Sequence, residues 1–166
     1  DLIIPTNFGF EDIEPQIKSS FDAAKQKLAE NGFNVVEINV PALDLYKKVP
    51  LWQFAAVESQ TEYFEAYNDK KHLMDPNILR RMDRANDVLA VEYNLLLNIR
   101  EKLIKEFNNF LKNNFLLLPT VTIYPPLLED CKDEPYYDEV NLISLRNTTL
   151  ANYMNGCSIS LPYSKD

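Results

Sequence analysis

The fold is decided by the stretch Pro15–Val40, PQIKSSFDAAKQKLAENGFNVVEINV, which predicts a helix, a turn and a strand in succession. Proline stands in the first turn of the helix and Gly32 follows its last turn, an asymmetry that helices favour. Apolar residues recur on one face of the helix at helical spacing and predict a buried face. They are Ile17, Phe21, Ala24 and Leu28. The β-branched run Val35–Val40 then predicts a strand, which Pro41 ends.

The segment before this stretch completes a recognisable unit. Leu2–Ile4 is a short apolar run that Pro5 ends, and it predicts a first strand. A strand, a helix and a second strand within about 40 residues are what a parallel βαβ crossover requires. The amino-terminal quarter of the chain is therefore expected to begin a parallel sheet.

The rest of the chain predicts further helices and two more strands. Helical composition and capping signals occur over residues 43–67, 76–86, 88–113 and 141–153. Phe115–Leu118 and Cys157–Leu161 predict strands buried in the sheet, and residues 121–139 predict a long surface loop. The expected fold class is α/β, with a mixed sheet of about four strands flanked by about five helices. Residues 1–166 are expected to form a single, incomplete domain.

Charge and glycine content exclude several classes of function. The net charge of -8 argues against binding of nucleic acid through phosphates. No apolar stretch reaches the ~20 residues that span a bilayer, and no signal-peptide pattern opens the chain. Phosphate, dinucleotide and oxyanion loops need several glycines close together, and the three present, Gly9, Gly32 and Gly156, are far apart. We expect no cofactor, no contact with nucleic acid or membrane, and a cytoplasmic location.

Single reactive residues are better explained by structure than by chemistry. His72 lies in a polar stretch with nothing to orient it as a base, which favours a surface residue. Cys157 lies on a predicted buried strand, which favours core packing. The acidic residues 129–134 lack the spacing of a calcium loop and predict a solvated loop, so no metal site is expected. Aromatic residues at 52–67 predict core packing, with a substrate funnel as the alternative.

Four short patterns follow one another along the chain. They comprise Gly32, Val35 and Glu37; Tyr93 and Arg100; Leu117–Thr120 with Pro125–Pro126; and Thr149, Asn152, Ser160 and Pro162. In this order and spacing they resemble the second half of the amidase-signature family. The resemblance covers essentially the whole chain. It departs from the family at Asn155–Cys157, where the family has a glycine and then a proline.

The resemblance implies an enzyme that hydrolyses carboxamides or transfers their acyl group. The family uses a serine nucleophile, a second serine and a lysine, with an oxyanion hole of backbone N–H groups. Those residues lie in a Gly/Ser-rich core that is absent here, so we expect no catalytic residue and no amidase activity in this chain alone. The expected partners are a small amide substrate and the remainder of the same polypeptide, and a homo-oligomer is allowed for. Alternatives are the amidase subunit of a tRNA-dependent amidotransferase and a non-catalytic α/β binding module.

Four residues are predicted to bind the substrate. Thr120 and Tyr124 follow the strand predicted at 115–118, where α/β sheets place ligand-binding loops. The resemblance puts Arg146 near the position at which related amidotransferase subunits hold the polar end of their substrate, and Asn152 belongs to the last pattern. In the alternative interpretation, Thr120 and Asn152 cap backbone groups and Arg146 pairs with the acids of residues 129–139.

Overall fold

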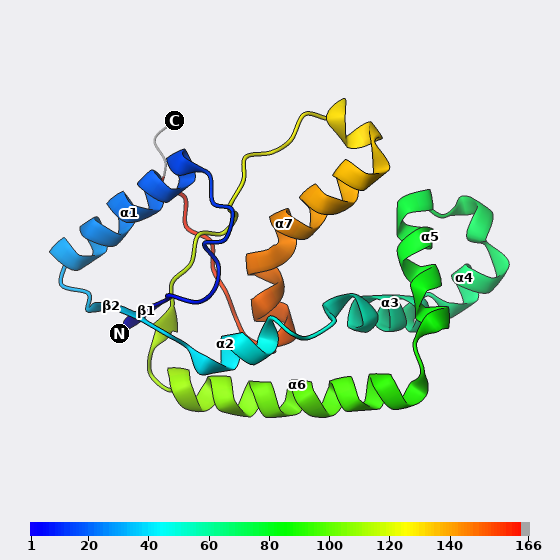
Figure 1. The fold of residues 1–166 in the computed structure, drawn as a ribbon, viewed down its shortest axis with the longest axis horizontal. Coiled ribbons are helices and arrows are strands. Elements are labelled where there is room, and N and C mark those ends of the chain that lie inside the picture. The colour runs from blue at the N-terminus through cyan, green and yellow to red at the C-terminus, as the bar shows by residue number, and fades with distance from the viewer. Residues whose placement is uncertain (164–166) are drawn as a thin grey trace. The chain divides into compact units, whose positions relative to one another are not determined.

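The computed structural model describes residues 1–163, and these form two compact units. Unit 1 contains residues 1–44 and the residues from Ile104 onward, whereas unit 2 is Leu45–Leu103. Two helices pass from one unit into the other, α2 (Pro41–Tyr46) and α6 (Ala90–Leu111) (Figure 1).

Unit 1 is built on a parallel sheet with the strand order β2-β1-β3 (Figure 1). The strands are β1 (Leu2–Pro5), β2 (Val35–Ile38) and β3 (Phe115–Leu116). In the register, Leu2 lies beside Val35 on one side and beside Phe115 on the other. Ile3 and Ile4 of the central strand are buried. The predicted βαβ crossover is therefore confirmed, with α1 (Pro15–Glu30) as its helix.

Gly32 ends α1 in the way that the sequence predicts. Its φ angle is +87°, a region that side chains other than glycine rarely adopt. The Gly32 N–H donates to the carbonyl of Ala29 and the Phe33 N–H to that of Leu28, the pair of bonds that defines a Schellman cap. The predicted face of α1 is only half-buried rather than buried. The sheet is narrow, and the residues that the structure describes supply little surface to cover a helix of sixteen residues.

The structure corrects the predicted sheet in its number of strands, their direction and their extent. Within residues 1–163 it has three strands instead of about four, and all of them are parallel instead of mixed. Residues 157–161 form no strand and are exposed, because no described strand lies beside them to accept and donate hydrogen bonds. The strand predicted at 115–118 is shortened to Phe115–Leu116, and the Phe115 side chain is 70% exposed. Phe115 is therefore not buried on both faces as predicted.

A long helix, α7 (Glu134–Tyr153), carries the carboxyl-terminal part of unit 1. It begins seven residues before the predicted start at 141, because Asp133 accepts a hydrogen bond from the Tyr136 N–H and Pro135 occupies the first turn. A short 3₁₀ turn, η3 (Asp130–Lys132), precedes it, and the segment between β3 and η3 is irregular, as predicted for the start of the 121–139 loop.

Unit 2 consists of helices alone among its described residues. The predicted helical region 43–67 is divided into α2, α3 (Leu51–Glu62) and α4 (Phe64–Asp69). The two helices predicted next are confirmed: α5 (Pro76–Asp83), which Asp75 caps, and α6. Short 3₁₀ turns, η1 (Lys71–Leu73) and η2 (Arg84–Asp87), connect them. The buried residues of the unit are Tyr46, Val49, Ala56, Tyr67, Met82, Leu96 and Leu103. In total, residues 1–163 contain seven α-helices, against about five predicted.

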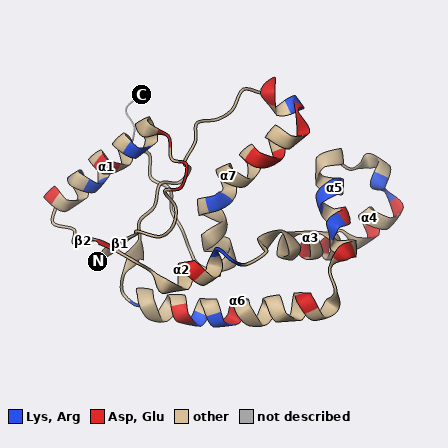
Figure 2. Ribbon diagram, viewed as in Figure 1, with Lys and Arg blue, Asp and Glu red and all other residues tan. Residues whose placement is uncertain are grey.

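Charges of both signs alternate along α1 and α6 instead of collecting in a basic stripe (Figure 2). Within residues 1–163, no helix combines the length and the apolarity that crossing a membrane would require.

Candidate active-site region

Two loops of unit 1 leave the sheet at its carboxyl edge and bind to each other. One follows β1 and the other follows β3, and parallel strands end at the same edge, where α/β proteins place their ligand sites. The Glu14 N–H donates to the carbonyl of Thr122 at 2.9 Å. The Tyr124 N–H donates in return to the Glu14 carboxylate, also at 2.9 Å. The sheet and these two bonds fix the loops side by side.

Arg146 on α7 binds both loops. Its Nη2 donates to the carbonyl of Glu11 and to Oγ1 of Thr122, the latter at 3.0 Å. Nη1 lies 3.5 Å from the carboxylate of Asp12, which is 76% exposed. Nε is buried and has no hydrogen-bond partner among the described residues. The guanidinium is thus held through Nη2, while its side chain is 23% exposed and keeps donors for a further acceptor.

Arg146 does not pair with the acids of residues 129–139, as the alternative interpretation proposed, but lies beside Asp12. The partners that the structure gives to its guanidinium come from residues 11–12 and from Thr122, and not from the acidic loop 129–139. Because Asp12 is exposed and 3.5 Å away, its attraction for Arg146 is weak, of the order of 1 kcal/mol or less. A carboxylate of a bound molecule could replace it at small cost.

The structure brings three of the four predicted residues near one another. Thr120 and Tyr124 flank the buried Thr122, and Thr122 binds Arg146. Thr120 Oγ1 lies 2.8 Å from Ser160 Oγ, and Tyr124 is 50% exposed. Asn152 is six residues beyond Arg146 on α7, and at 100° per residue it projects from a different face of that helix. Its side chain is exposed.

Sequence reasoning missed Thr122 and Asn147, the two buried polar residues of the region. The Asn147 side chain donates to the carbonyls of Gly9 at 3.0 Å and Pro119 at 2.8 Å, and so binds both loops from α7. The sequence did contain one signal for this region, the presence of Gly9 in a chain with only three glycines. Its φ angle of +91° explains why that position is glycine, and its carbonyl is one of the two that Asn147 binds.

His72, Cys157 and the acidic residues 129–134 were all predicted to have no catalytic or metal-binding role. His72 is exposed on η1, as predicted. Cys157 is exposed, so the prediction that it packs in the core is wrong. In the acidic stretch, Asp133 caps α7, and the described residues contain no group of three or more His, Cys, Asp or Glu side chains that could hold a metal ion.

The aromatic residues at 52–67 divide between core and surface. Tyr67 is buried and its hydroxyl donates to Asp83 at 2.6 Å, whereas Tyr63 and Phe64 are exposed. The guanidinium of Arg84 stacks on the ring of Trp52, with Arg84 Cζ 4.0 Å from the ring centroid. The prediction of core packing therefore holds for Tyr67 and is wrong for Tyr63 and Phe64.

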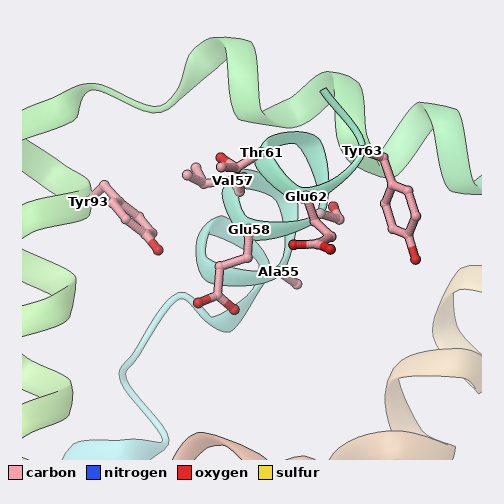
Figure 3. Close-up of a pocket in the computed structure, with 8 residues that line it drawn as sticks. Ala55, Val57, Glu58, Thr61, Glu62, Tyr63 and Tyr93 are labelled. Atoms are coloured by element: carbon pink, nitrogen blue, oxygen red, sulfur yellow. Dashed lines mark hydrogen bonds between the residues drawn. The ribbon is translucent and has the colours of Figure 1, made fainter. Parts of the chain in front are cut away.

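An open groove of about 710 Å³ lies on unit 2 between α3 and α6. Figure 3 shows Glu58 and Glu62 projecting from α3 toward the same side, with the ring of Tyr93 extending toward them. Desolvation, together with the negative charge of Glu58, raises the pKa of Tyr93 above its usual range. The groove is open and its lining is more apolar than polar, and neither glutamate has an ion-pair partner among the residues that the structure describes.

Comparison with known proteins identifies the class to which this fold and these loops belong. The family model for amidases matches residues 3–166, so the chain belongs to the amidase family, as its sequence patterns predict. Among curated proteins, the chain is similar to 2-amino-5-chloromuconic acid deaminase of Comamonas testosteroni, with 30% identity over 173 residues. The alignment covers 98% of this chain and 36% of that relative, so the chain spans little more than a third of the relative's length.

Proposed function

We propose that the complete protein hydrolyses a C–N bond of a small substrate that carries a carboxylate, and that this chain supplies part of the substrate pocket. The observation that carries the proposal is the state of Arg146. Its Nη2 is fixed by the Glu11 carbonyl and Thr122, while Nε has no partner and Nη1 faces only the exposed Asp12. A guanidinium held in this way is preorganised to donate hydrogen bonds from Nη1 to an anion.

Two comparisons support the same reaction class. The amidase family match covers almost the entire chain. The relative named above is called a deaminase of an amino-substituted carboxylic acid, and this suggests a substrate with both a C–N bond to break and a carboxylate to hold. Thr120 and Tyr124, with exposed side chains beside the Arg146 partner Thr122, are proposed to contact the substrate at the rim. Asn152 remains a predicted contact.

The chemistry itself is proposed to depend on residues outside this chain. A serine oxygen attacks the carbonyl carbon, the C–N bond breaks with proton transfer to the leaving nitrogen through the second serine and the lysine, and water then releases the acid. Arg146 would contribute by holding the distant carboxylate, so that the reacting carbonyl lies in a fixed place.

The test uses the complete protein and two probes, succinamate and butyramide, which differ by a carboxylate. Arg146→Met should lower kcat/KM for succinamate at least ~10-fold, or about 1.4 kcal/mol, and change that for butyramide much less. Lys18→Met removes a charge of the same sign from an exposed position on α1 and serves as the control. Ammonia release measures both reactions.

An equal loss for the two amides would contradict the anchoring role of Arg146. A serine-directed phosphonate provides the second measurement, because it labels the nucleophile covalently. Labelling should fall outside residues 1–166, and stoichiometric labelling of Ser158 or Ser160 would show that the nucleophile lies within this chain. Absence of both labelling and ammonia release would contradict amide hydrolysis.

A further inference from the structure

Asn147 has a buried polar side chain that binds two separate parts of unit 1. It is 7% exposed, and its single Nδ2 donates to Gly9, 138 positions away, and to Pro119, 28 positions away. Both partners are backbone carbonyls, which only accept hydrogen bonds. The amide must therefore present its nitrogen to them, and both of its N–H groups are used.

The place where these groups meet is closely packed. A Cβ atom added to Gly9 would lie 2.5 Å from Cδ2 of Leu118 and 3.5 Å from Nδ2 of Asn147. The loop after β1 thus approaches the loop after β3 as closely as a bare backbone allows. Leu118 immediately precedes Pro119, the second residue that Asn147 binds, so the packing and the hydrogen bonds act at one point.

The groups that hold Arg146 are attached to this point. Glu11 supplies a carbonyl to Nη2, and its carboxylate accepts from the Gly9 N–H at 2.7 Å. Thr122, the other acceptor of Nη2, is three residues after Pro119. Glu11 is thus two residues from Gly9, and Thr122 is three residues from Pro119. Asn147 therefore binds the chain close to each residue that accepts a hydrogen bond from Nη2.

We propose that Asn147 is a positioning residue, which sets the place of the Arg146 guanidinium by fixing the two loops that bind it. The proposal rests on the proposed function of Arg146 as substrate anchor. A residue with a merely structural role would lower the stability of unit 1 and lower activity equally toward all substrates. A positioning residue would in addition lower the preference for the substrate that carries the carboxylate.

The decisive variant is Asn147→Asp in the complete protein, which keeps the shape of the side chain and removes both N–H donors whether or not the carboxyl group is ionised. Thr148→Ala is the matched control, since Thr148 is the exposed neighbour on α7 and its hydroxyl donates within the helix to Leu145. Asn147→Ser keeps one hydroxyl donor and should therefore change both readouts by less than Asn147→Asp. If the aspartate variant does not fold, the serine variant is used in its place.

The first readout is amide hydrogen exchange followed by mass spectrometry, and it is independent of catalysis. Peptides covering residues 9–14 and 119–124 should exchange at least ~10-fold faster in Asn147→Asp, because the Glu14 and Tyr124 N–H bonds between the loops open more often. Peptides from β1 and the middle of α7 should be unchanged, as should every peptide of Thr148→Ala. Unchanged exchange in both loops would overturn the proposal, whether or not the protein hydrolyses amides.

The second readout is the ratio of kcat/KM for succinamate to that for butyramide. This ratio should fall at least ~5-fold in Asn147→Asp, mainly through KM for succinamate, and stay constant in Thr148→Ala. A fall in kcat/KM that is equal for both probes, together with faster exchange throughout unit 1, would show that Asn147 acts only on stability. If the wild-type protein does not prefer succinamate while the loops still loosen as expected, the substrate proposal fails and the positioning of Arg146 by Asn147 stands.

Discussion

The loops around Arg146 and the groove between α3 and α6 both gather polar side chains, but they do so in opposite ways. Around Arg146, Thr122 of one loop and Asn147 of α7 are buried, and their bonds join segments that are distant in the sequence. In the groove, Glu58 and Glu62 stand one turn apart on the exposed side of a single helix. The loops specify a geometry through long-range hydrogen bonds, whereas the two glutamates of the groove lie on one helix and make no such bonds within residues 1–163.

This difference gives an order of expected effects. A polar group whose partners come from several segments cannot move without disturbing all of them. A carboxylate on a solvated helix face can move freely and contributes little. Substitutions in the loops should therefore cost more than equivalent substitutions elsewhere, and those in the groove should cost least.

The largest effect on stability is expected for Gly9→Ala. The added methyl group meets Leu118, and the φ angle of +91° is unfavourable for alanine, which together predict a loss of about 2–3 kcal/mol in the free energy of unfolding. Gly32→Ala is the matched comparison, since its φ angle is +87° and nothing lies within 4 Å of the new Cβ. It should cost only the backbone term of about 1–2 kcal/mol. Denaturant unfolding measures both, and equal losses would show that the loops are not closely packed at Gly9.

A smaller effect is expected for Asp133→Ala, which removes the side-chain cap of α7. The lost bond from the Tyr136 N–H should cost about 1 kcal/mol of stability. The cap lies more than three turns before Arg146, so the ratio of succinamate to butyramide turnover should not change. Asp75→Ala removes the corresponding cap of α5 in unit 2 and should cost a similar amount. A changed substrate ratio in Asp133→Ala would mean that the geometry at Arg146 depends on the helix end rather than on the loops.

The smallest effect is expected for Glu62→Gln in the groove. Glu58 and Glu62 are like charges at helical spacing i and i+4, and removing one should stabilise the helix by about 0.2–0.5 kcal/mol. Hydrolysis of both probes should be unaffected. A marked loss of stability or of activity would show that Glu62 makes specific interactions, as the residues around Arg146 do, and that the two regions do not differ in this respect.

The sequence predicted those parts of the fold that depend on local signals. Proline at the start of α1 and glycine after its end mark the helix, and the β-branched run after Gly32 marks β2. Each of these signals acts through the backbone of a few neighbouring residues, so a single sequence is sufficient to read it. The family resemblance, carried by four spaced patterns, is confirmed by the family match.

The parts that could not be predicted depend on neighbours in space. Cys157–Leu161 has the composition of a strand, yet a strand requires a partner, and the described residues offer none there. Thr122 and Asn147 carry ordinary polar side chains, and nothing near them in the sequence indicates that both are buried beside the loops that bind Arg146. Arg146 was selected by resemblance, but its partners Glu11 and Asp12 are more than 130 positions away, so only the fold could show them.

The central position of β1 in the sheet also has a consequence for how the protein is made. Ile3 pairs on one side with Val36, which is translated soon after it, but its other neighbour, Leu116, is translated much later. At typical rates of about 5–20 residues per second, the second edge of β1 stays open on the ribosome for several seconds after β2 has been made. During that time an unpaired apolar edge is exposed to other nascent chains. Slow codons between β2 and β3 would lengthen this interval, and a chaperone that shields strand edges should raise the yield of folded protein.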